Sequence, residues 1–134
     1  MKPLEVCGAI LLKENKVLCA QRGENKYDYL SYRWEFPGGK LEAGETAAQA
    51  LHRELIEEMD VHVDAEDMEP FYVVEHQYPD FELRMHCFIC KVSDCEVNLK
   101  EHADMCWATI DEIEKLDWLP ADRPVVDALV KRGF

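Results

Sequence analysis

The chain has 134 residues, and 48% of them are hydrophobic, which is enough apolar material for the core of one globular domain spanning residues 1–134. Its 28 acidic residues outnumber the 15 basic ones, and the formal net charge is −13. A chain this acidic repels nucleic acids and anionic membrane surfaces. We therefore expect neither a nucleic-acid polymer nor a membrane among its partners.

The N-terminal segment and the cysteines favour a cytoplasmic protein. The first apolar run is interrupted by Glu5, which is more typical of a first strand than of a secretory signal, and no apolar stretch approaches membrane-spanning length. The six cysteines lie mostly in strand-like segments and are expected to be reduced thiols. Cys87 and Cys90 are poor candidates for a metal pair, because a strand directs residues three apart to opposite faces. His86 and His102 are interpreted as surface or hydrogen-bonded histidines.

The first half of the chain is predicted to form a hairpin, a loop, a short strand and a helix. Two apolar runs at residues 4–12 and 16–22 flank a polar turn, as in a β-hairpin. A polar and aromatic loop at 23–33 leads to a short strand at 34–37. After a glycine-rich turn, residues 46–59 are rich in strong helix formers and contain neither glycine nor proline, so this segment is the clearest helix.

The second half is predicted to contain another hairpin, a short strand and two further helices, at residues 69–78 with 81–92, 105–110, 111–119 and 121–134. The turn signal Pro79-Asp80 separates the two strands of the hairpin. In the last segment, Asp122 is the expected N-cap and Pro124 lies in the first turn. This mixture predicts the α/β class, with a mixed sheet covered by helices.

Three carboxylates fall on one side of the helix predicted at 46–59. An advance of about 100° per residue brings Glu54, Glu57 and Glu58 together, beside an apolar stripe that can pack on the sheet. A solvated acidic face would gain from a basic residue four positions later, and none of these glutamates has one. Mg²⁺ commonly binds a few carboxylates together with water and substrate phosphates. A cation site therefore explains the cluster better than a solvated face.

Glycines precede this helix. Gly38 and Gly39 allow a tight turn of the backbone and a close approach to a ligand or metal, because they carry no side chain. Pro37 stiffens the approach, and Gly44 permits a second turn. The fixed position of the glycines ahead of the glutamate helix is what indicates a site.

The spacing of these residues resembles the Nudix box. Gly39 is followed after five residues by Glu45, and after seven more by the run Arg53-Glu54-Leu55-Ile56-Glu57-Glu58, with Val61 at the terminal apolar position. Asp60 stands where the family usually has glycine, and Asp tolerates a left-handed helix end better than most residues. The resemblance extends over nearly the whole chain to MutT-like nucleoside triphosphate pyrophosphohydrolases, especially their CTP pyrophosphohydrolase branch.

This resemblance implies the Nudix fold, an α/β/α sandwich. It also implies hydrolysis of a (deoxy)nucleoside triphosphate to a monophosphate and pyrophosphate, in nucleotide pool cleaning or salvage. Mg²⁺, for which Mn²⁺ can substitute, would be held by the Gly38 carbonyl and by the carboxylates of Glu54, Glu57, Glu58 and Glu101. Glu54 would be the general base acting on a metal-bound water, with Glu57 and Glu101 completing the catalytic set.

The resemblance also implies supporting and phosphate-binding residues. Arg53 would orient carboxylates by ion pairing, Glu45 would hold the loop to the helix, and Gly39 would give the backbone room. Arg22 and Lys40 match basic positions of the family and are the candidates for direct phosphate contacts.

Recognition of the nucleobase is expected from aromatic and polar side chains. Candidates for stacking, each of which can equally serve in packing, are Tyr27, Tyr29, Phe36, Tyr78 and Phe81. Asp122 matches the position at which MutT enzymes acting on 8-oxo-dGTP carry asparagine. An ionised Asp only accepts hydrogen bonds, which favours an exocyclic amino group such as that of cytosine. The alternative is that Asp122 only caps the last helix.

Three alternative functions share parts of the pattern. An 8-oxo-dGTP diphosphatase of MutT type would differ in the base it reads, and a hydrolase of nucleoside diphosphate sugars or ADP-ribose would differ in the outer pocket. A non-catalytic nucleotide-binding Nudix module is expected to have a degenerate box, whereas every metal-site glutamate is present here. In each case the partner is a small-molecule nucleotide, and the chain is expected to be a monomer or weak dimer.

Overall fold

The computed structural model describes residues 3–93, 97 and 102–134. The strands are β1 (Leu4–Lys13), β2 (Lys16–Gln21), β3 (Trp34–Glu35), β4 (Gly38–Lys40), β5 (Glu69–Gln77), β6 (Glu82–Lys91) and β7 (Asp104–Ala108). The helices are α1 (Ala47–Met59), α2 (Ile110–Ile113) and α3 (Arg123–Arg132), with short 3-10 turns at Asp28–Leu30 and Ala65–Asp67. Both predicted hairpins are confirmed, because β1 pairs with β2 and β5 pairs with β6 in antiparallel register.

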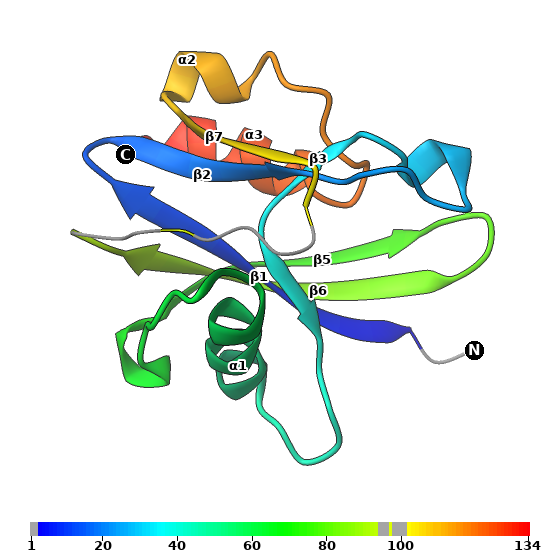
Figure 1. Cartoon of the computed structure of the whole chain (residues 1–134), viewed down its shortest axis with the longest axis horizontal. Coiled ribbons are helices and arrows are strands. Elements are labelled where there is room, and N and C mark those ends of the chain that lie inside the picture. The colour runs from blue at the N-terminus through cyan, green and yellow to red at the C-terminus, as the bar shows by residue number, and fades with distance from the viewer. Residues whose placement is uncertain (1–2, 94–96, 98–101) are drawn as a thin grey trace.

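The strands form one mixed sheet that divides near the β1–β2 hairpin (Figure 1). The order is β3-β2-β1-β6-β5, with β4 paired to β1 and β7 paired to β2. β1 runs parallel to β6 along most of its length, whereas its register with β2 covers only the residues next to the hairpin turn. β1 and β2 therefore separate, and the freed edges pair with β4 and β3.

Each face of the sheet has its own apolar core, and alternate residues of β1 supply both. Ala9 and Leu11 pack in the core under α1, whereas Ile10 and Leu12 pack in the core under α3. Figure 1 shows α1 on one side of the sheet and α2 with α3 on the other. The predicted α/β/α sandwich with a mixed sheet is therefore confirmed.

The helix predicted at 111–119 is confined to the single turn α2. A capping box formed by Thr109 and Glu112 starts it. Trp118 ends the helical path, because its indole nitrogen donates to the Ile113 carbonyl at 2.7 Å and its backbone bridges to Trp34 of β3. Burial of Trp118 against the sheet overrides the weak local preference for helix.

The cysteines behave as predicted where the structure describes them. Cys87 and Cys90 lie in different cores, on opposite faces of β6. Across residues 3–93, 97 and 102–134, the cysteines are free thiols. In the same ranges, no helix has the length and apolar character needed to cross a membrane.

Candidate active site

A cavity of about 1290 Å³ is bordered by helix α1, strands β3 and β4 and the loop at 22–27. The predicted site residues that line it are Arg22, Tyr27, Phe36, Gly38, Gly39, Lys40, Glu54, Glu57, Glu58, Tyr78, Phe81 and Asp122. Glu45 and Arg53 are outside this lining, and Glu101 lies outside the described residues. The volume is ample for a nucleotide.

Helix α1 presents its glutamates to the cavity because both of its ends and its apolar face are fixed. The Thr46 hydroxyl accepts from the Gln49 N–H at 3.2 Å, and the Gln49 side chain accepts from the Thr46 N–H at 2.9 Å, which is a capping box. At the other end, Asp60 adopts the left-handed conformation with φ of 57°, as predicted. Leu51, Leu55 and neighbouring apolar residues are buried on the sheet, which leaves the acidic side toward β4.

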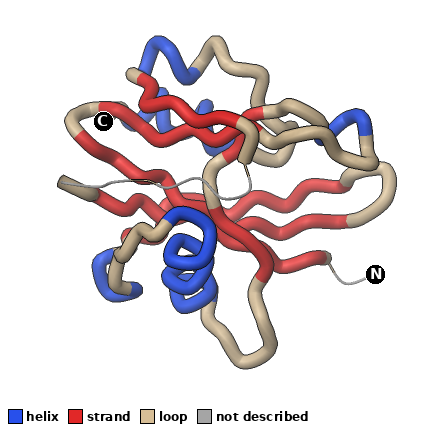
Figure 2. The backbone as a smooth tube through the Cα atoms, in the orientation of Figure 1, coloured by secondary structure: helices blue, strands red, loops and turns tan. Residues whose placement is uncertain are grey.

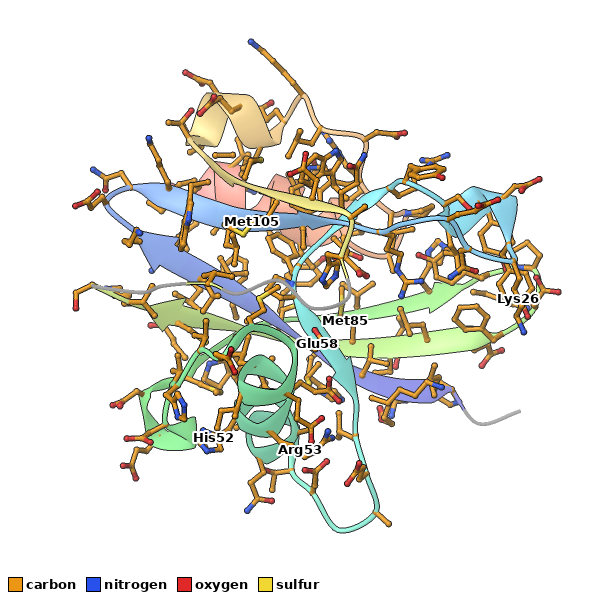
Figure 3. The ribbon with its side chains drawn as sticks, viewed as in Figure 1. Lys26, His52, Arg53, Glu58, Met85 and Met105 are labelled. Atoms are coloured by element: carbon orange, nitrogen blue, oxygen red, sulfur yellow. The ribbon has the colours of Figure 1, made fainter. Side chains whose placement is uncertain are left out.

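Figure 3 shows the two sides of this helix. Glu58 lies next to β4, and Arg53 lies on the side facing the β4–α1 loop, whereas His52 lies on the opposite side. That loop projects well beyond the sheet (Figure 2). The loop contains Glu45, whose carboxylate forms an ion pair with Arg53 of α1.

Gly38 and Gly39 lie in the extended strand β4 rather than in a tight turn. Neither has a positive φ, whereas Gly44 has a φ of 86°. The turn predicted at the first two glycines is therefore wrong, and the turn at Gly44 is confirmed. The glycines are needed for space instead: a Cβ on Gly38 would overlap the backbone carbonyl of Cys7, and one on Gly39 would overlap the carboxylate of Glu54.

The pairing of β4 also determines where its carbonyl groups point. The backbone groups of residues 37 and 41 form hydrogen bonds with β1 at 2.7 and 3.1 Å. In an antiparallel pair this orientation alternates, so the carbonyls of Gly38 and Lys40 point away from β1. The Lys40 carbonyl accepts from Arg53 Nη2 at 3.1 Å, as this geometry requires. The Gly38 carbonyl is thus directed away from the ladder and can serve as an oxygen ligand.

Arg53 connects the loop to the carboxylates of α1. Its Nε and Nη2 donate to the two carboxylate oxygens of Glu45, each at 2.9 Å, which is a bidentate pair. Its Nη1 donates to Glu54 Oε1 at 2.8 Å and to Glu57 Oε2 at 3.2 Å. A single guanidinium therefore offsets part of the repulsion among the glutamates and holds two of them in place.

Stability is expected to depend on pH through Glu45. Hydrogen bonds from Arg53, assisted by the backbone N–H of Glu42, lower the pKa of Glu45 from 4.5 to about 2. A lowered folded-state pKa contributes stability that is complete above pH 4.5 and is lost as the pH falls toward 2. Over this window the Tm should fall more steeply for the wild type than for Glu45→Gln, which has no charge to lose. Because Glu45 is partly exposed, salt should reduce the difference.

Thermal unfolding followed by circular dichroism at a series of pH values measures this slope. Glu66→Gln is the matched control, since Glu66 is an exposed carboxylate outside the Arg53 network. Parallel pH profiles for the wild type and Glu45→Gln would show that the ion pair makes no contribution.

The oxygen donors on this side of the cavity suit a hard divalent ion. Carboxylates from α1 and the Gly38 carbonyl are the ligand types that Mg²⁺ and Mn²⁺ take. Among the residues with described positions, no three carboxylate, imidazole or thiolate groups already converge as ligands of one ion. Arg53 holds Glu54 and Glu57 toward itself, so a bound ion would require these side chains to shift.

Aromatic side chains line another part of the cavity. Tyr78 is buried and stacks on Tyr29, with ring centroids 5.6 Å apart. Burial raises the pKa of Tyr78 to about 12, so its hydroxyl stays protonated at neutral pH. Phe36 is also buried, with its ring centroid 4.8 Å from that of Trp118. Four of the five candidates for stacking, all except Tyr29, line the cavity, and of these Phe36 and Tyr78 are also buried by packing.

Asp122 does not cap the last helix with its side chain. It stands at the N-cap position of α3, but its carboxyl makes no capping hydrogen bond. Oδ2 instead accepts from the Phe36 N–H at 2.9 Å, and the residue is only 3% exposed. Burial, followed by the nearby charge of Glu35, raises the pKa of Asp122 well above its ordinary value, against smaller opposing effects of Phe36 and Arg22. The interpretation of Asp122 as only a cap is wrong.

Among the cavity residues that were not predicted as site residues, Glu35 and His102 form a hydrogen-bonded group with Arg22. Glu35 accepts from Arg22 Nε at 3.1 Å and from His102 Nε2 at 2.9 Å. Glu35 lies directly opposite Ala20 on the neighbouring strand, which places it diagonally next to Arg22 on the same face. This proximity depends on strand pairing, so no local pattern in the sequence indicates it.

Comparisons with known proteins agree with this geometry. The profile of the NUDIX domain family matches residues 6–128. CTP pyrophosphohydrolase of Escherichia coli is 33% identical, over 97% of this chain and 93% of its own. Putative 8-oxo-dGTP diphosphatase 2 of Mycobacterium tuberculosis is 35% identical, over 92% and 84%. The solution structure of the E. coli ORF135 protein has a TM-score of 0.81 and 30% identity, and the match covers 96% of this chain and 89% of that one.

Proteins of this family are hydrolases that use divalent metal ions and act on small nucleotide substrates. The family match covers most of the described residues, including the β4–α1 segment and Asp122. The match covers 93% and 84% of the lengths of the two relatives, so the likeness is not limited to the glutamate helix. The chain therefore belongs to the NUDIX domain family of hydrolases.

Proposed function

We propose that this protein hydrolyses a nucleoside triphosphate to the monophosphate and pyrophosphate, with Mg²⁺ as the metal and Mn²⁺ as an effective substitute. The observation that carries the proposal is one cavity lined by the α1 glutamates, the Gly38 segment and the buried carboxyl of Asp122. Relatives named for CTP and 8-oxo-dGTP support a triphosphate substrate over a diphosphate sugar. The complete set of box glutamates supports catalysis over binding alone.

The residues of α1 and β4 take distinct parts in this reaction. A bound ion supplies charge neutralisation and lowers the pKa of a coordinated water. Glu54, oriented by Arg53 at 2.8 Å, is placed to accept the proton of the attacking water. Glu57 and Glu58, with the Gly38 carbonyl, provide oxygen ligands. Glu101, which lies outside the described residues, stays a predicted ligand.

The phosphates of the substrate require positive charge in a chain that is acidic overall. Lys40 is exposed at the cavity and is free to meet a phosphate as a point charge. Arg22 Nε donates a hydrogen bond to Glu35, so the terminal nitrogens of Arg22 are the ones that would contact a phosphate. In-line transfer needs this positioning, together with the glutamates that bind the ion.

Asp122 is proposed to read the base, with cytosine as the leading candidate. The Phe36 N–H requires an acceptor at Oδ2, so Oδ1 is the oxygen left for the substrate. An ionised Oδ1 accepts from the exocyclic amino group of cytosine. The second candidate is a modified purine such as 8-oxo-dGTP. It is favoured by the raised pKa of Asp122, because the neutral acid donates a hydrogen bond instead.

Product analysis with a substrate panel tests the proposed function. Purified protein would be incubated with and without Mg²⁺ or Mn²⁺ and with CTP, dCTP, 5-substituted cytidine triphosphates, 8-oxo-dGTP, the common nucleoside triphosphates and ADP-ribose. Monophosphate and pyrophosphate should form only with metal. Nucleotide binding without any metal-dependent product would instead identify a non-catalytic module.

The variant Asp122→Asn is expected to change the preferred base. The Phe36 N–H would hold the amide oxygen at the Oδ2 position, so the amide NH₂ would occupy the Oδ1 position as a donor. A cytosine amino group would then face another donor, and kcat/KM for cytosine nucleotides should fall about tenfold or more. Turnover of a nucleotide whose base accepts a hydrogen bond from protonated Asp122 should be retained, because the asparagine NH₂ is also a donor. Unchanged ratios of kcat/KM among the nucleotides of the panel would show that Asp122 does not recognise the base.

A further inference from the structure

His102 lines the cavity, and one of its two ring nitrogens has no hydrogen-bond partner. Its side chain is 9% exposed, and its Nε2 lies 2.9 Å from Glu35 Oε2. Its Nδ1 is buried and, within the described part of the chain, is the one buried side-chain nitrogen or oxygen without a hydrogen-bond partner. Buried polar atoms are paired in the great majority of cases, so this atom requires an explanation.

The hydrogen bonds of Glu35 determine which nitrogen of His102 carries hydrogen. A carboxylate only accepts, and Glu35 already accepts from Arg22 Nε at 3.1 Å through its other oxygen. His102 Nε2 must therefore be the donor to Glu35. In the neutral ring, Nδ1 then carries a lone pair and can only accept a hydrogen bond.

The series Arg22–Glu35–His102 fixes the orientation of this ring. Arg22 follows β2, Glu35 belongs to β3, and His102 precedes β7, so three segments distant in sequence meet here. The residue after His102 is also anchored, because the Ala103 N–H donates to the Gln21 carbonyl at 2.9 Å. The lone pair of Nδ1 is thus held in a defined direction.

The position of His102 relative to the rest of the site indicates which part of a nucleotide it meets. Its partner Glu35 directly precedes Phe36, whose N–H is bound by Asp122. Gly38 of the proposed metal site follows three positions after Glu35, and these residues line the same cavity as His102 and Asp122. A nucleotide with its base at Asp122 and its phosphates at α1 would therefore place its nucleoside portion alongside His102.

We propose that His102 is a positioning residue whose Nδ1 accepts a hydrogen bond from the nucleoside portion of the substrate, either from a sugar hydroxyl or from an amino group of the base. This inference rests on the proposed function and adds a contact to it. Substrate binding then pairs the one buried nitrogen that is unpaired among the described residues. A purely structural His102 would need only Nε2, to support Glu35.

Two substitutions separate these roles. Glutamine in His102→Gln can place its amide nitrogen near Nε2 and donate to Glu35, but it offers no acceptor near Nδ1. Asparagine in His102→Asn can place its amide oxygen near Nδ1, but it is too short to reach Glu35. If Nδ1 positions the substrate, His102→Gln should raise KM about 5- to 10-fold with little change in kcat, and His102→Asn should retain the wild-type KM.

A structural role predicts the opposite effects on KM: His102→Gln would have the KM of the wild type, and His102→Asn would have a raised KM. That result would overturn the proposal. So would an unchanged KM in both variants. Ribose and deoxyribose forms of one nucleotide identify the donor. An increase in KM confined to the ribonucleotide assigns the 2′-hydroxyl, and an equal increase with both sugars assigns the base or another hydroxyl.

Nuclear magnetic resonance of ¹⁵N-labelled imidazole provides a readout that needs no turnover. The free protein should show the Nε2–H tautomer of His102, and addition of nucleotide should shift the Nδ1 signal. An Nδ1–H tautomer in the free protein would overturn the inference even if the enzyme is active. Absence of turnover by the wild type on every substrate would contradict the proposed function instead, while the tautomer would still test His102.

Discussion

Turnover is expected to fall about 10²- to 10⁴-fold when either Glu54 or Glu57 is replaced by glutamine, while the folded structure is retained. Glutamine keeps the size of the side chain and can still accept a hydrogen bond from Arg53, but it cannot act as a base or neutralise a divalent ion. Glu57 is 59% exposed on its helix, so the loss of its charge should cost little stability. Removal of one charge also lowers the repulsion within the cluster.

Pyrophosphate release at saturating metal and substrate measures this effect, and the Tm reports the fold. Glu66→Gln removes one exposed carboxylate outside the main cavity and should retain full activity. A metal titration adds a second test, because loss of a ligand should raise the metal concentration needed for half-maximal rate. Full activity in Glu57→Gln would show that the carboxylates of α1 are not the catalytic centre.

Gly38→Ala and Gly39→Ala are expected to differ, although they are neighbours in β4. A Cβ on Gly38 would overlap the backbone carbonyl of Cys7 in β1, and backbone cannot rotate away, so the two strands must separate. We expect a loss of about 3 kcal/mol or more in the free energy of unfolding, which lowers the Tm by about 10 °C. A Cβ on Gly39 would meet the end of the Glu54 side chain, which can move.

Gly39→Ala should therefore fold with a smaller loss in Tm but should lose most activity, because Glu54 would be displaced from its place beside Arg53. Gly23→Ala is the matched control for stability, since the nearest atom to its Cβ would be that of Ala103 at an ordinary 3.9 Å. A Tm of Gly38→Ala close to that of the wild type would contradict this prediction, and so would full activity of Gly39→Ala. Either result would show that β4 or its neighbours can shift to accommodate a Cβ.

Local sequence determined the helix and its chemistry. The spacing of Glu54, Glu57 and Glu58 depends only on helical periodicity, and the capping signals at Thr46 and Asp60 are local as well. Periodicity and turn residues also predicted both hairpins, and alternation along a strand predicted the different cores of Cys87 and Cys90. The Nudix box could therefore be recognised before any tertiary contact was known.

Tertiary structure decided the contacts between segments that are distant in sequence. The Asp122 carboxyl binds the Phe36 N–H across 86 positions, and His102 binds Glu35 across 67. The position of Asp122 before the last helix left a helix cap and a contact with the base as alternatives, and only the folded chain shows its hydrogen bond with Phe36 and the burial that raises its pKa. Residue patterns report periodicity within one element, whereas the pairing of β3 with β2 and the packing of α3 on the sheet determine which side chains lose water and meet.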